Sequence, residues 1–88
     1  GPKQRLDAVC LSQALKRAQD LIHGGQNSEV KVAAELRKFI HKTKGTRVEY
    51  VEIVNSETLE PVKEIKGRTL IALAVRIGKA RLIDNILL

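Results

Sequence analysis

The chain ends on the stretch Thr69-Leu70-Ile71-Ala72-Leu73-Ala74-Val75-Arg76-Ile77-Gly78-Lys79-Ala80-Arg81-Leu82-Ile83-Asp84-Asn85-Ile86-Leu87-Leu88. Its first half alternates every second residue, which is the pattern of a β-strand. The bulky face of this strand consists of Ile71, Leu73, Val75 and Ile77, and the opposite face of Ala72, Ala74 and Arg76. Gly78-Lys79 makes a tight connection into the second half, so the stretch predicts an antiparallel hairpin. An apolar terminal strand is ordered only when it is held in a sheet, so we expect further strands.

Asp84 and Asn85 interrupt the second strand of this hairpin. Asp84 alternates in phase with the apolar residues around it, so it is expected on the core-facing side, where an unpaired carboxylate is costly. It either bonds to backbone donors and an arginine such as Arg76 or Arg47, which is the favoured interpretation, or points into a wet edge. Asn85, on the opposite face, is expected to satisfy turn or edge groups. We therefore predict structural roles for both residues.

A third strand is predicted upstream, from Arg47 to Val54, where β-branched residues become frequent. Its alternation slips at Tyr50-Val51, which predicts either a β-bulge or a strand that is covered on both faces. The following segment, Asn55 to Pro61, is expected to form a turn or a single helical turn that Asn55 can cap.

Two amphipathic helices precede these strands. The first runs from Gln4 to His23, and Gly24-Gly25 ends it, with the first glycine in a left-handed cap. The second starts after the N-cap Ser28 and ends before Gly45. The two buried stripes are predicted as Ala8, Leu11, Leu15, Ala18 and Ile22, and as Val32, Leu36, Phe39 and Ile40.

Two helices and three strands in this order predict an α+β fold, a two-layer sandwich of two helices on a three-stranded, mainly antiparallel sheet. The 88 residues make one domain. Phe39 and Tyr50 are the only aromatic residues, so we expect an aliphatic core without a large ligand cavity.

Composition narrows the class of protein. The net charge of +6 is compatible with a polyanionic partner. The basic residues are scattered and mixed with acids, however, which favours solvated faces. Cys10 is the single cysteine, which excludes an intrachain disulfide and predicts a reducing, cytoplasmic location. No apolar run reaches the roughly 20 residues of a membrane span. Gly1-Pro2 is predicted to be the remnant of a cleaved expression tag, which leaves residues 3–88 as the domain.

Chemical motifs are missing from the sequence. There is no Gly-rich phosphate loop, no Cys/His metal spacing, and no Ser-His-Asp or Cys-His arrangement. His23 and His41 stand alone near the expected helix ends, where they favour a role toward the helix dipole over ligand binding. We predict no catalytic residue and no metal site in this chain.

Two segments carry a family resemblance. The run from Arg76 to Leu88 resembles the C-terminal signature of bacterial pantoate–β-alanine ligases, and Asn55-Ser56-Glu57-Thr58-Leu59-Glu60-Pro61 after a strand is similar to a second block of that family. Gln4-Arg5 at the start of the first helix agrees with it too. The blocks occur in the right order and separation, so the resemblance covers nearly the whole chain after Gly1-Pro2.

The resemblance implies a parent enzyme that activates pantoate with ATP and Mg²⁺ to pantoyl adenylate, which β-alanine then attacks to give pantothenate and AMP. It also implies a Rossmann-like N-terminal domain with a His-x-Gly-His motif, a Ser-Ser-Arg-Asn signature just before the region where this chain begins, and a homodimeric full-length enzyme. Neither motif occurs in these residues. The chain is thus expected to be a C-terminal lid that is inactive alone, holds no cofactor, and binds neither nucleic acid nor membrane.

Two basic clusters are candidates for a lid edge that favours closure over ATP phosphates. They are Arg76, Lys79 and Arg81 around the hairpin, and Lys42, Lys44 and Arg47 at the junction of helix and strand. Solvated surface charge is the competing interpretation.

Two other functions of the chain stay open. The first is a small basic nucleic-acid-binding α+β module, which the scarcity of aromatic residues disfavours. The second is an interaction module that dimerises through its last strand.

Overall fold

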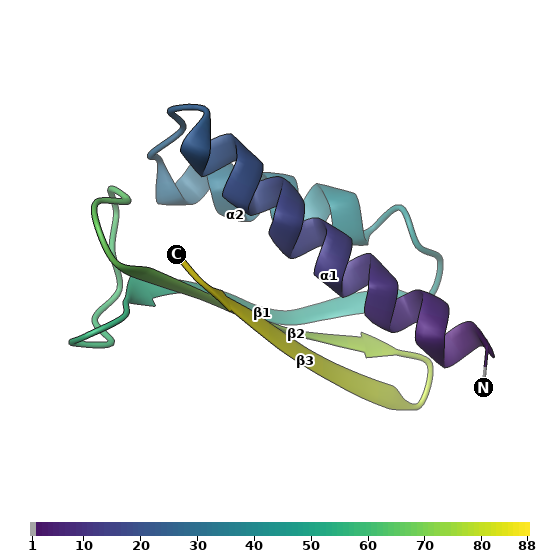
Figure 1. Ribbon diagram of the computed structural model, residues 1–88. Coiled ribbons are helices and arrows are strands. Elements are labelled where there is room, and N and C mark those ends of the chain that lie inside the picture. Colours follow the sequence, from purple (N-terminus) through teal and green to yellow (C-terminus); the bar gives the residue numbers. More distant parts are fainter. Residues whose placement is uncertain (1) are drawn as a thin grey trace.

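Two helices lie on one face of a three-stranded sheet (Figure 1). The computed structural model describes residues 2–88, with side chains from Val9 onward. The elements in chain order are α1 (Pro2–His23), α2 (Glu29–Ile40), β1 (Thr46–Asn55), β2 (Thr69–Ile77) and β3 (Ala80–Leu87). The predicted two-layer α+β sandwich is confirmed, and both strand pairings are antiparallel.

Helix α1 ends in a glycine cap, but the predicted glycine was wrong. Gly25, and not Gly24, has a positive φ, of 106°. The N–H of Gln26 donates to the carbonyl of Leu21 at 2.9 Å and the N–H of Gly25 to that of Ile22 at 3.1 Å. These two bonds are those of a Schellman motif, in which the left-handed residue is the one just after the helix cap. The first glycine therefore keeps the helical sense and the second reverses it.

Helix α2 starts as predicted and ends earlier. The Ser28 hydroxyl accepts a hydrogen bond from the N–H of Lys31, which confirms it as the N-cap. The helix ends at Ile40, not just before Gly45, because the chain tightens into a turn there. The Thr46 hydroxyl donates to the carbonyls of Ile40 and Thr43, at 3.2 and 2.9 Å, and this closes the turn onto the start of β1.

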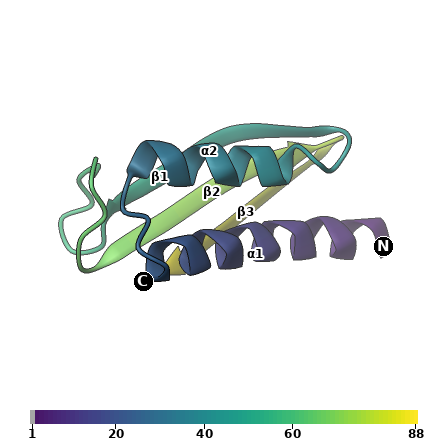
Figure 2. The ribbon, with the colours of Figure 1, turned by 90° about the horizontal axis from the view of Figure 1, so that it is seen from above.

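The strand order β1-β2-β3 leaves β2 in the centre. Seen from above, α2 lies over β1 and α1 over β3 (Figure 2). Both helical stripes are buried as predicted, apart from Ile22 and Phe39, which are partly buried, and Ala8, whose side chain lies outside the described residues. The centre of the core consists of the fully buried side chains Leu11, Val32, Leu36, Ile40, Ile71, Leu73 and Val75. The aliphatic core expected from the sequence is thus formed between the layers.

A β-bulge in β1 resolves the slip in its alternation. Val48 pairs with Val75 and Tyr50 with Ala74, so Glu49 is the extra residue on β1. Paired residues share a face of an antiparallel sheet, and the extra residue shifts the alternation by one. Of the two interpretations left open by the sequence, the bulge is therefore correct. It keeps valines on the core face on both sides of the irregularity, while Tyr50 turns to the face opposite the helices, called the outer face below.

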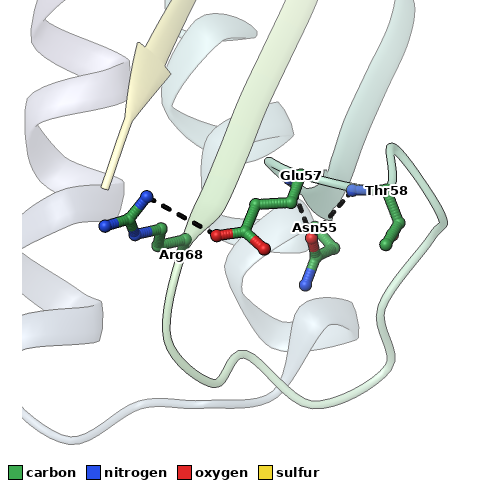
Figure 3. A network of polar contacts seen from close by, with 4 residues as sticks. All are labelled: Asn55, Glu57, Thr58 and Arg68. Atoms are coloured by element: carbon green, nitrogen blue, oxygen red, sulfur yellow. Dashed lines mark hydrogen bonds and ion pairs between the residues drawn. The ribbon is translucent and has the colours of Figure 1, made fainter.

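The connection between β1 and β2 is ordered by its own side chains (Figure 3). The Asn55 side-chain oxygen accepts from the N–H groups of Glu57 and Thr58, at 2.8 and 3.0 Å, as predicted for its capping role. An Nη of Arg68 lies 3.5 Å from the Glu57 carboxylate and ties the two ends of the loop together. Leu59 follows with a φ of 62° and a largely exposed side chain. The segment that carries the family resemblance is a defined loop.

Candidate functional site

Three arginines form a row across the outer face at the hairpin end of the sheet. Arg47 on β1 pairs with Arg76 on β2, and Arg76 pairs with Arg81 on β3. Because register partners lie side by side on the same face, one side chain of the row comes from each strand. The two basic clusters predicted from the sequence therefore join: Arg47 belongs with Arg76 and Arg81. We call these three residues the arginine row.

Glu49 lies within this row because of the bulge. Its carboxylate accepts a hydrogen bond from Nε of Arg81 at 2.7 Å. Arg47 and Arg76 have no ion pair with a carboxylate in the part of the chain whose side chains are described. Together with Val48 and Glu49 they line a hollow of about 280 Å³. The row thus has one neutralised arginine and two guanidinium groups that are available to an anion.

The three arginines change the pKa of Glu49, which lies among them. The hydrogen bond from Arg81 has the largest effect and lowers the pKa of Glu49. Desolvation comes second and raises the pKa, and the positive charges of Arg81, Arg76 and Arg47 each lower it by a smaller amount. Glu49 is therefore a carboxylate at neutral pH. The sequence pattern did not single out this residue. The break in alternation at Tyr50-Val51, one position later, was nevertheless a signal of the bulge that turns the Glu49 side chain toward the arginines.

A titration tests this arrangement. The folded pKa is lowered, so the pair stabilises the domain above the unfolded pKa of about 4.3 and ceases to do so as the pH falls through the lower folded value. NMR detection of the side-chain carboxyl carbon of Glu49 should give a midpoint below the ordinary glutamate range. Arg81→Ala should raise that midpoint, whereas Arg37→Ala, on the other layer, should leave it unchanged. Equal midpoints in all three proteins would show that the pair does not form in solution.

The other predicted basic residues lie apart from the row. Lys79 is exposed in the hairpin turn that adjoins it. Lys42 is placed with its Nζ 5.5 Å from the centre of the Phe39 ring, a cation–π geometry that gives it a local role. Lys44 is exposed in the connection into β1. Of the six candidates, the strand register places only Arg47, Arg76 and Arg81 in one row. This register cannot be read from the sequence alone.

Asp84 lies on the core-facing side of β3, as predicted, since it pairs with Leu73. The expected arginine partner was wrong, because Arg76 and Arg47 belong to the outer face. The carboxylate instead accepts the N–H of Asn85 at 2.8 Å and borders a shallow hollow beside Ser12 of α1. The favoured interpretation thus holds for its backbone donor and not for its arginine, and the partial exposure of Asp84 agrees with the alternative of a wet edge.

Across the residues described, no group of three or more His, Cys, Asp or Glu side chains is placed to hold a metal ion. His23 lies in the last turn of α1 and His41 caps α2, which are the helix-end positions expected for them. None of the helices described is long and apolar enough to span a bilayer.

Comparison with known proteins assigns the chain to a family. The family model described as Pantoate-beta-alanine ligase matches residues 1–87. The chain is 45% identical over 86 residues to the pantothenate synthetase of Acetivibrio thermocellus, covering 98% of this chain and 31% of that protein. It is 43% identical over 83 residues to the enzyme of Caldicellulosiruptor saccharolyticus, covering 94% of this chain and 30% of that protein.

The fold agrees with this assignment. The crystal structure of pantothenate synthetase from Thermus thermophilus superposes with a TM-score of 0.84 at 27% identity, covering 98% of this chain and 31% of that one. The chain thus spans a little under a third of the length of these relatives. The resemblance seen in the closing strand and in the loop after β1 is confirmed, and the chain belongs to the pantoate–β-alanine ligase family.

Proposed function

We propose that this chain is the C-terminal domain of a pantothenate synthetase and that it closes as a lid over the adenylating site on the rest of the polypeptide. The family assignment and the share of the relatives that the chain spans, 31%, support this proposal. The N-terminal Rossmann-like domain of the same chain is the proposed partner, within a homodimeric cytoplasmic enzyme. The proposed boundaries are residues 3–88, with Gly1-Pro2 as a tag remnant.

The arginine row is the observation that carries the proposal. ATP is the cofactor of the proposed reaction, in which pantoate attacks the α-phosphorus and pyrophosphate leaves. Guanidinium groups suit phosphate oxygens because their planar fork donates two parallel hydrogen bonds. Arg47 and Arg76 would hold the phosphates from the lid side, while Glu49 keeps Arg81 in place beside them. Mg²⁺ is proposed to be held by the N-terminal domain together with the phosphates of ATP.

A lid would serve this chemistry in two ways. An acyl adenylate reacts with water, so closure that excludes water preserves it for β-alanine. Closure driven by contacts to bound ATP would also complete the site only when the nucleotide is present. Asp84 and Asn85 have structural roles in this proposal, and the domain contributes no catalytic residue, so the isolated domain is inactive.

Recombining the two parts tests the proposal. The domain and the separately produced N-terminal two-thirds of the enzyme are mixed, and pantothenate formation from ATP, pantoate and β-alanine is measured. The domain alone should form none, the N-terminal part alone should be impaired, and the mixture should recover activity as the domain concentration rises. An N-terminal part that is as active alone as in the mixture would contradict the role of the domain as a lid.

A further inference from the structure

The outer face of the sheet has no second layer. Both helices lie on the other side, and over residues 2–88 no element covers this face (Figure 1). The register arranges its side chains in rows across the three strands: the arginine row, then Tyr50-Ala74-Ile83, then Glu52-Ala72-Asn85, then Val54-Leu70-Leu87. A sheet that carries helices on one side only is stable with polar residues on the other. Here two of the four rows are apolar.

Each apolar row carries one large exposed side chain. Ile83 is 57% exposed and Leu87 66% exposed, both on β3. Ala74, between Tyr50 and Ile83, has no exposed surface, so this row meets a partner through the larger side chains that flank and cover the alanine. The polar row Glu52-Ala72-Asn85 lies between the two apolar rows, so the face carries apolar and charged side chains side by side. Exposed apolar side chains of this size on one face are typical of an interaction surface.

We infer that this outer face is the surface by which the domain docks on the remaining two-thirds of its own polypeptide, with Ile83 and Leu87 as apolar contacts. The inference rests on the proposed function, which requires the arginine row to face the nucleotide. The row lies on the outer face, so closing over the phosphates turns the apolar rows toward the same partner. The relatives, about three times longer than this chain, supply that partner surface.

A second copy of the domain fits this surface less well. The chain carries a net charge of +6, and each outer face holds three arginines against two acids, Glu49 and Glu52. Two such faces in contact would bring like charges together. The partner surface should therefore be apolar opposite Ile83 and Leu87, and should present the anionic phosphates opposite the row.

Site-specific thiol labelling of the full-length enzyme tests which face closes. Ile83→Cys and Leu87→Cys report on the outer face, and Val30→Cys, at a position 71% exposed on α2, is the matched control on the opposite layer. Each is made in a Cys10→Ser background. Labelling by N-ethylmaleimide is followed by mass spectrometry of the peptide, with and without ATP and pantoate. If the closed form reaches nine parts in ten, labelling at residues 83 and 87 should slow about tenfold, with residue 30 unchanged.

The other outcomes separate the inference from the proposed function. Protection of residue 30 without protection of 83 and 87 would overturn the docking face while leaving a closing lid. Equal labelling of all positions in both states would overturn the lid and the docking face together. Protection at 83 and 87 that needs no substrate and grows with protein concentration would indicate a second copy, which would also overturn the inference.

Discussion

Leu73→Ala should lower the free energy of unfolding of the domain by about 2–5 kcal/mol. Leu73 lies on the central strand β2, faces the helices, and is completely buried. Truncation removes apolar contacts and leaves a cavity that the two packed layers fill only partly. Total stability for this length is on the order of 4–13 kcal/mol, so this single change removes a large share of it.

Urea unfolding of the isolated domain, followed by circular dichroism, measures the effect. The midpoint should fall while the dependence on denaturant stays the same. Leu87→Ala is the matched control, since its side chain is 66% exposed, and it should change stability by no more than about 0.5 kcal/mol. Equal losses in the two variants would mean that the core does not lie between the sheet and the helices.

Removing the free arginines should weaken the full-length enzyme more than any other surface change on this domain. A hydrogen bond to a charged group contributes about 1.5–3 kcal/mol, so Arg47→Ala or Arg76→Ala should each lower kcat/KM for ATP about 10- to 150-fold. Arg76→Lys keeps the charge and loses the planar fork, so it should recover only part of the loss. Steady-state kinetics with ATP as the varied substrate give these ratios.

The control for these variants is Arg37→Ala, an exposed arginine on α2. It makes the same chemical change on the other layer and should leave kcat/KM unaltered. Circular dichroism of each variant should match the parent, because the row is on the surface. Wild-type kinetics in both arginine variants would favour the competing interpretation, in which the row is ordinary solvated charge.

Local sequence patterns predicted the helices, the strands and their caps, because each of these features depends mainly on residues that are close together in the chain. The alternation from Thr69 to Ile77, the N-cap Ser28 and the capping Asn55 are all of this kind, and all are confirmed. The ends of the two helices were harder to predict from the sequence. Hydrogen bonds beyond the last turn of α1 decide which of Gly24 and Gly25 has the positive φ. Hydrogen bonds beyond the last turn of α2 likewise decide that it ends before Gly45.

The candidate site could be predicted only as a set of charges. Arg47 is far in sequence from Arg76 and Arg81, and only the pairing of three strands places them in one row. The same pairing assigned Asp84 to one face and its expected arginine partners to the other. Glu49 was missed because its direction depends on a bulge whose position the sequence indicated to within about one residue.

The carboxylate of Asp84 also has a consequence for how the protein behaves at high concentration. Strand β3 is an edge of the sheet, and the N–H of Leu88 points inward to the carbonyl of Thr69. Successive N–H groups of a strand point to opposite sides, so the N–H of Asn85 points outward, away from β2. There it already donates to the Asp84 carboxylate. A second β3 aligned antiparallel about this point would meet an engaged donor and bring two carboxylates together. This apolar edge strand thus resists the edge-to-edge growth that leads to aggregation.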